Sequence, residues 1–408
     1  MQISRHFSKL SKLKTKNTIA FFGSFLVLSF FTFFIWNSSK VVLYSQDQAT
    51  SVALVGAPRT TGTVVPLGEN NPPPPPELPP PQHIKTPDAV RAVYMTSWVA
   101  GTASIRDPLL SFVENSEINS IVIDVKDYSG KMSFEVDNSV VDAMQSEEKR
   151  IPDMRAFIDR LHQKNIYVIA RITVFQDPQA ARMRSDLAVK NKNGGLWKDK
   201  NGLAYIDPGA KDFWAYIVEM SRVSERVGFD EINFDYIRFP SDGQIALAVF
   251  PFQNGRAKAD VLEDFFKYLR GELKDLSVPI SADVFGLTTY ADDDLNIGQV
   301  LERTAPYFDY IAPMVYPSHY ASGFGGFKNP AEYPYEVIFK SMSRGIEKLK
   351  AMGEDAKKFR PWIQDFDLGT NYGIAEVNKQ KQALYDLGIQ SWMAWDPSNN
   401  YTKPAYKH

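Results

Sequence analysis

GFDEINFDYIRFP, residues 228–240, has the pattern of a buried strand that ends in polar side chains. Gly228 closes a helical run before it, and Pro240 stops the strand after it. Asp235, Tyr236 and Arg238 lie where the strand ends. Since an apolar core does not tolerate unpaired charges, this cluster favours a functional site. In a β/α barrel the C-terminal ends of the strands carry the active site.

The rest of the chain supplies enough strands for such a barrel. Eight short runs are rich in β-branched and aromatic residues: 92–98, 120–127, 166–175, 231–240, 279–287, 310–317, 360–367 and 391–397. Most are nearly continuous apolar runs, as parallel strands buried on both faces require. Apolar residues at helical spacing fill the gaps between them, over 152–164, 211–227, 258–276, 335–352 and 374–387.

This alternation predicts an α/β fold, a (β/α)8 TIM barrel spanning residues 90–408. After the last strand only residues 398–408 remain, which is short for a full closing helix. Either the last helix is missing, or another segment covers that edge of the barrel.

The N-terminal region predicts a membrane anchor. Residues 19–36, IAFFGSFLVLSFFTFFIW, are apolar and uncharged, and the basic tail 1–18 precedes them. A helix of this length nearly crosses a hydrocarbon core of about 30 Å, and the basic flank places the tail in the cytoplasm. We expect an uncleaved single-pass signal-anchor in the cell membrane, with a cleaved signal peptide as the alternative.

Residues 37–89 have the composition of a disordered linker and include NPPPPPELPPP at 71–81. Such a proline run is an extended, stiff spacer. The barrel domain would therefore stand outside the cytoplasm, away from the membrane surface.

Composition limits the chemistry. The chain has no cysteine, so disulfides and thiolate metal sites are excluded. It has only five histidines, which disfavours a histidine-built zinc site and a Ser-His-Asp triad. The net charge of −2 gives no sign of nucleic-acid binding. We expect no metal and no cofactor, and carboxylates as the reactive groups. Aromatic residues make up 13% of the chain, which suits a sugar-binding cleft.

Nearly every predicted strand ends in a polar or aromatic group. Besides Asp235 and Asp283, the candidates for substrate binding are Trp98, Asp124, Lys126, Arg171, Tyr236, Arg238, Tyr316, Gln364, Asp365 and Trp395. Pairing explains a few of these as architecture, and Arg171 is a candidate counter-ion for Asp235. Asp127 and Asp396 are equally compatible with turns, and Trp98 and Trp395 with the core.

Two carboxylates can cleave a glycosidic bond when one stays ionised and the other carries a proton. Asp235, beside basic residues, suits the ionised role. Asp283, in SADVFG without a basic neighbour, suits the acid role. Asp124, Asp127 and Asp365 are reserve candidates for the acid.

The segments GFDEINFDYIRFPSDG, VRAVYMTSWVAG, NSIVIDVKDYSG and WMAWDP resemble the putative glycosyl hydrolase domain family of bacterial envelope proteins. The resemblance covers most of residues 90–400 and implies a TIM barrel related to glycoside hydrolases. The central strand also resembles the chitinase pattern DG-x-D-x-D-x-E. Ile237 stands where that pattern has its acidic Glu, so the α-amylase arrangement is the better analogy for Asp235 and Asp283.

The sequence therefore predicts a membrane-anchored, extracytoplasmic glycoside hydrolase acting on an envelope or extracellular polysaccharide. A non-catalytic carbohydrate-binding pseudo-hydrolase is the main alternative. A metal-dependent polysaccharide deacetylase is a second, which the scarcity of histidine disfavours.

Overall fold

The computed structural model describes residues 80–407. Eight parallel strands form a closed barrel in the order β1-β10-β9-β8-β7-β5-β3-β2. Their bounds are β1 Arg91–Met95, β2 Ser120–Lys126, β3 Tyr167–Thr173, β5 Glu231–Asp235, β7 Ile280–Phe285, β8 Tyr310–Met314, β9 Trp362–Gln364 and β10 Trp392–Trp395. Each lies within one of the eight predicted runs, except that β1 begins one residue earlier, so the predicted barrel is confirmed.

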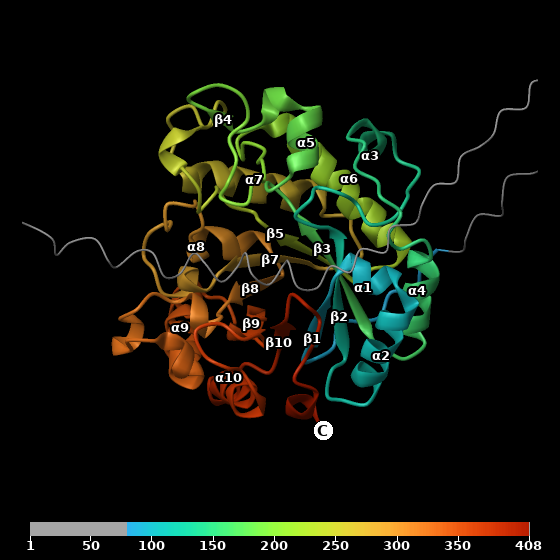
Figure 1. The fold of residues 1–408 in the computed structure, drawn as a ribbon, viewed down its shortest axis with the longest axis vertical. Coiled ribbons are helices and arrows are strands. Elements are labelled where there is room, and N and C mark those ends of the chain that lie inside the picture. Colours follow the sequence, from blue (N-terminus) through green and yellow to red (C-terminus); the bar gives the residue numbers. More distant parts are fainter. Residues whose placement is uncertain (1–79, 408) are drawn as a thin grey trace, which may run out of the picture. The chain divides into compact units, whose positions relative to one another are not determined.

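Helices surround the strands (Figure 1). They are α1 Ser97–Gly101, α2 Ala103–Glu114, α3 Ser139–Ala143, α4 Met154–His162, α5 Pro178–Met183, α6 Lys211–Val227, α7 Lys258–Glu272, α8 Leu301–Thr304, α9 Pro334–Ala351 and α10 Ile374–Asp386. The five predicted helices correspond to α4, α6, α7, α9 and α10. A short antiparallel pair, β4 Lys190–Asn191 and β6 Ala248–Val249, joins the loops that follow β3 and β5.

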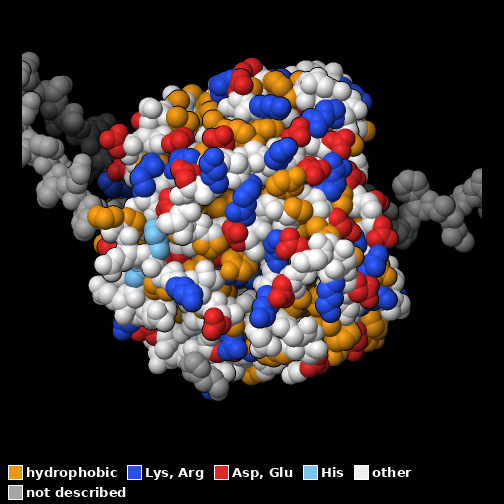
Figure 2. All heavy atoms as spheres, turned by 180° about the vertical axis from the view of Figure 1, so that it is seen from behind, with side chains coloured by type: hydrophobic (Ala, Val, Ile, Leu, Met, Phe, Trp, Pro, Cys, Tyr) orange, Lys and Arg blue, Asp and Glu red, His pale blue; other side chains and the backbone are white. Residues whose placement is uncertain are grey.

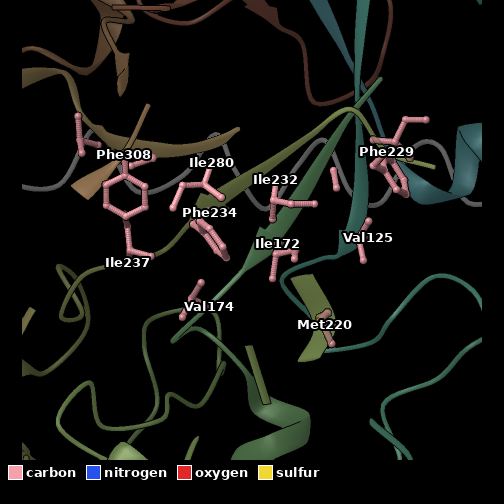
Figure 3. Packing of buried hydrophobic residues seen from close by; sticks show 14 of the residues in the cluster. Val125, Ile172, Val174, Met220, Phe229, Ile232, Phe234, Ile237, Ile280 and Phe308 are labelled. Atoms are coloured by element: carbon pink, nitrogen blue, oxygen red, sulfur yellow. The ribbon is translucent and has the colours of Figure 1, made fainter. Parts of the chain in front are cut away.

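The main core lies between the barrel and its helices. Ile172 of β3 and the side chains of Ile232 and Phe234 of β5 point outward into this layer and are fully buried. Figure 3 shows this apolar row, which continues to Phe308 and to Met220 of α6. The alternate residues of the same strands face the barrel interior, and these are the ones that can build a site.

The edge without an eighth helix is closed by the C-terminal segment. Residues 403–406 form a 3-10 turn, and Tyr401 and Tyr406 are buried against Phe112 of α2. The Nζ of Lys381 donates to the carbonyl of Ala405 at 2.5 Å. Both alternatives left open by the sequence hold within the described residues, because no α-helix follows β10 and another segment covers the edge.

Residues 82–90 close the N-terminal end of the barrel, where the strands begin. The backbone N of Ile84 donates to Asp230, which directly precedes β5, at 2.8 Å. Thr86 and Tyr167, the first residue of β3, share a 3.1 Å hydrogen bond. The folded domain thus includes residues that the sequence assigned to the linker, because their contacts are mostly polar and leave no apolar pattern.

The remaining N-terminal predictions lie outside the described residues: the basic tail 1–18, the anchor 19–36 and the linker up to residue 79. Within residues 80–407, no helix combines the length and apolarity that crossing a bilayer requires. On the face shown in Figure 2, acidic and basic side chains are interspersed, without a broad area of one sign.

Lys126 illustrates how the strand register decides the direction of a side chain. Asp124 pairs with Arg171, but Lys126 pairs with Ile172, so β2 advances two residues where β3 advances one. This bulge turns Lys126 outward, where it is fully buried in an ion pair with Asp177 and near the rings of Phe213 and Tyr216.

Replacing Lys126 by Ala should lower the free energy of unfolding by about 3–5 kcal/mol, because Asp177 would remain buried without its partner. Urea denaturation followed by tryptophan fluorescence measures this. Lys149→Ala is the matched control, since Lys149 pairs with Glu135 in solvent and should matter little. Equal unfolding midpoints for the two variants would contradict a structural role for Lys126.

Candidate active site

One guanidinium lies at the centre of the C-terminal end of the barrel interior. The Nη1 of Arg171 donates to Asp124 at 2.6 Å, and its Nη2 pairs with Asp235. Its Nε lies 3.9 Å from Asp283. Carboxyl groups from β2, β5 and β7 thus converge on a single cation from β3. All four are nearly buried, with Asp235 the most exposed of the three carboxylates at 5%.

Asp235 is held by donors on both oxygens. Oδ2 accepts from Arg171, and Oδ1 accepts from the backbone N of Tyr236 at 2.5 Å. Tyr236 reaches this position with a left-handed backbone, φ 52°. The strand therefore ends abruptly at Asp235, and the chain turns so that its own amide caps the carboxylate.

Asp283 has a different environment. Its Oδ1 accepts from the indole Nε1 of Trp362 at 2.8 Å and from the amide of Asn233 at 3.0 Å. Burial, followed by the charge of Asp235, raises the pKa of Asp283 to about 8, against the opposing effect of Arg171. Because Oδ1 accepts two hydrogen bonds, the proton belongs on Oδ2.

Asp124 completes the cluster. Its Oδ2 accepts from the hydroxyl of Tyr94 at 2.5 Å, and its Oδ1 from Arg171. Burial raises the pKa of Asp124 above its usual value, although Arg171 and Tyr94 oppose the rise. Both oxygens are thus occupied by protein donors.

An aromatic wall adjoins these groups. Tyr94 and Trp395 stack with ring centroids 4.0 Å apart, and Trp362 meets Trp395 edge-on at 5.5 Å. The guanidinium of Arg171 lies 5.1 Å from the Trp395 ring. Trp395 is partly exposed, so an indole face borders the carboxylates. Tyr316, at the end of β8, is almost buried beside Phe366.

Other predicted site residues lie outside this cluster. Arg238 packs over Tyr236 and Phe285 and donates to Ser241, so it supports the loop after β5. Gln364 binds the backbone of Ser318 and Phe366 and joins two loops.

Three further predicted residues lie away from the carboxylates for clear reasons. Lys126 points outward because of the bulge in β2. Asp365 faces the C-terminal segment, where its Oδ2 accepts from Thr402 and Tyr406. Trp98 lies on the rim in α1 and is 56% exposed.

Sequence reasoning missed Tyr94, Asn233 and Trp362 as site residues. Asn233 and Trp362 lie two positions before the candidates Asp235 and Gln364, and Tyr94 lies two positions before Thr96, near the end of the predicted run 92–98. Because side chains alternate along a strand, inward-facing residues recur every second position. Counting back by two from each strand end would have found them.

The resemblance to the chitinase pattern fails at Ile237, which is buried where that pattern has its acidic Glu. Ile237 is fully buried in the outer core, so no acid replaces the missing Glu at that position. Asp230 lies at the opposite end of β5 and binds His162 and Ile84. Residues 80–407 contain no cluster of His, Asp and Glu suited to a metal ion.

The chain is similar to several solved structures. The glycoside hydrolase domain of PgaB (BpsB) from Bordetella bronchiseptica aligns over 78% of this chain and 99% of that one, with 13% identity and a TM-score of 0.57. A hypothetical protein from Ruminiclostridium thermocellum is 33% identical, with 47% and 97% coverage and a TM-score of 0.43. A chitinase from Chromobacterium violaceum is 12% identical, with 78% and 98% coverage and a TM-score of 0.45.

No curated protein matches the chain. Residues 92–401, which hold all of the barrel strands except Arg91 at the start of β1, match the family described as "Putative glycosyl hydrolase domain". The match includes every carboxylate around Arg171. The chain therefore belongs to the putative glycosyl hydrolase domain family, and its barrel is a glycoside hydrolase domain.

Proposed function

We propose that the protein is a membrane-anchored, extracytoplasmic glycoside hydrolase that cleaves an envelope or extracellular polysaccharide with Asp235 and Asp283. The observation that carries this proposal is the contrast between two neighbouring carboxyl groups. Asp235 accepts from a guanidinium and a backbone amide, whereas burial favours the protonated form of Asp283. When the surroundings of two neighbouring carboxyl groups favour different protonation states, one group can act as the acid and the other as the ionised carboxylate in glycoside hydrolysis.

The proposed division of labour follows from these contacts. Asp283 donates the proton on its Oδ2 to the glycosidic oxygen as the bond to the leaving sugar breaks. Asp235 provides negative charge for the oxocarbenium-like centre that develops at the anomeric carbon. Arg171 keeps Asp235 in position, and Trp362 and Asn233 orient Asp283. Trp395 offers its ring to a sugar face.

Membrane attachment is supported by residues 19–36 of the sequence. Residues 82–90 pack at the N-terminal mouth of the barrel, beside Asp230 and Tyr167. Residues 82–90 therefore lie at the end of the barrel opposite Asp235 and Asp283.

A non-catalytic carbohydrate-binding protein is the second candidate. The observation that favours it is the low exposure of Asp124, Asp235 and Asp283, each at 5% or less, together with their protein hydrogen bonds. Such a cluster could hold the barrel together while the aromatic side chains bind sugar. Glycan release by the parent protein separates the two functions.

Asp235→Asn and Asp283→Asn should each reduce glycan release by about 10²–10⁴-fold, because each removes one member of the acid and carboxylate pair. The assay measures new reducing ends from peptidoglycan, poly-glucosamine and α-glucans. Asp293→Asn, an exposed carboxylate in a loop, is the matched control and should behave as the parent. Undiminished release by both site variants would reject the hydrolase mechanism, and binding without any release would favour the second candidate.

The activity should also fall as the pH rises through about 8. Asp283 has a raised pKa, so it is protonated below that value and loses its proton above it. The pH profile of kcat/KM reports the ionisation of the free enzyme and should show this alkaline limb. Circular dichroism at each pH checks that the fold persists. A kcat/KM that is constant to pH 10 would contradict Asp283 as the acid.

A further inference from the structure

We infer that Trp98 and Tyr128 form an outer sugar-binding subsite on the rim of the barrel, which takes a pyranose ring of the glycan bound at Asp235. This inference rests on the proposed function and extends it. Among the large hydrophobic side chains that the structure describes, Tyr128 and Trp98 are the most exposed, at 58% and 56%. Exposed aromatic rings on a soluble domain commonly mark a binding surface when they occur together.

Both rings belong to the end of the barrel that carries the carboxylates. Trp98 follows Tyr94 by four residues on the chain leaving β1, and Tyr128 follows Asp124 by four residues on the chain leaving β2. β1 and β2 are paired neighbours. The strands that place Tyr94 and Asp124 inside the site therefore deliver Trp98 and Tyr128 to the adjoining rim.

Arg150 links the two positions. Its Nη1 donates to Ser97 at 3.0 Å and to Asp127 at 2.5 Å, the residues directly before Trp98 and Tyr128. Its Nη2 donates to Ser129 at 3.1 Å, directly after Tyr128. The Arg150 side chain is only 4% exposed. A buried guanidinium whose two Nη atoms donate to both chain segments thus fixes these segments relative to each other.

The same guanidinium also holds one face of the Trp98 indole. The Cζ of Arg150 lies 4.6 Å from the ring centroid, a cation–π contact. The indole is thereby oriented although more than half of its surface is open to solvent. Preorganised rings lose little conformational freedom on binding, which favours recognition by stacking.

The chemistry of the two rings fits a sugar. Neither the indole N–H of Trp98 nor the hydroxyl of Tyr128 hydrogen-bonds to any residue within 80–407 in the structure. Each therefore presents an apolar face for the C–H groups of a pyranose and a polar group for its hydroxyls. Asp127, by contrast, accepts from Arg150 and from Ser129, so it supports the chain segments that carry the two rings.

The test uses Trp98→Ala, Tyr128→Ala and the double variant in the full chain, with Tyr333→Ala as control. Tyr333 is another partly exposed ring, 39% exposed, that stacks on Phe327 and belongs to the segment between β8 and α9, not to the segments that follow β1 and β2. In an Asp235→Asn background, fluorescence titration measures binding of glucosamine, N-acetylglucosamine and maltose oligomers, each as a disaccharide and a hexasaccharide. Trp98→Phe tests whether another flat ring restores binding.

We expect each single Ala variant to weaken binding of one or more hexasaccharides about tenfold, which corresponds to about 1.4 kcal/mol. Disaccharide binding should be unchanged, because a short ligand occupies the centre without reaching the rim. In the active background, KM for the long substrate should rise while kcat stays constant. Tyr333→Ala should match the parent, and Trp98→Phe should recover most of the loss.

The inference is overturned if the double variant binds every hexasaccharide as tightly as the parent, or if the Asp235→Asn protein binds none of them. It is also overturned if disaccharides weaken equally, since that indicates a general structural effect. Failure of the proposed function is a separate result, because hydrolysis is measured by reducing ends and the subsite by binding.

Discussion

The site depends on one buried cation, Arg171, shared by three carboxyl groups. A single positive charge cannot balance Asp124, Asp235 and Asp283 inside a barrel where each is 5% exposed or less. Ionising all three would leave buried charge uncompensated, so proton uptake is the less costly state. Burial and, after it, the negative charge of Asp235 raise the pKa of Asp283. The proposed acid is therefore a consequence of burial combined with a shortage of positive charge.

The rest of the barrel interior supports this cluster. At its N-terminal end Arg360 pairs with Glu231, which also accepts from the hydroxyl of Tyr167 at 2.9 Å. Between the two charged ends lie apolar side chains such as Val122 and Ile169. Arg360 and Glu231 are thus paired locally, and the apolar layer separates the functional end from the end that residues 82–90 close.

The carboxylates, the aromatic wall and the rim follow from the same strand geometry. Inward positions supply the buried groups, and the first residues after each strand supply the rim. On β1 this gives Tyr94 inside and Trp98 outside; on β2 it gives Asp124 inside and Tyr128 outside. Loops after β3 and β5, joined by β4 and β6, extend the same end of the molecule.

By itself, the sequence determined the barrel and its eight strands, and it marked Asp124, Arg171, Asp235 and Asp283 as candidate site residues. Buried parallel strands leave a strong apolar pattern, and charged residues at their ends stand out against it. Only the tertiary structure decided which polar residues meet. The bulge that turns Lys126 outward, the C-terminal segment that binds Asp365 and the pairing of Arg150 with Asp127 depend on contacts between distant residues. Local composition does not specify such contacts. It does not fix the strand register either, and a one-residue change in register exchanges the two faces of a strand and so changes which side chains meet.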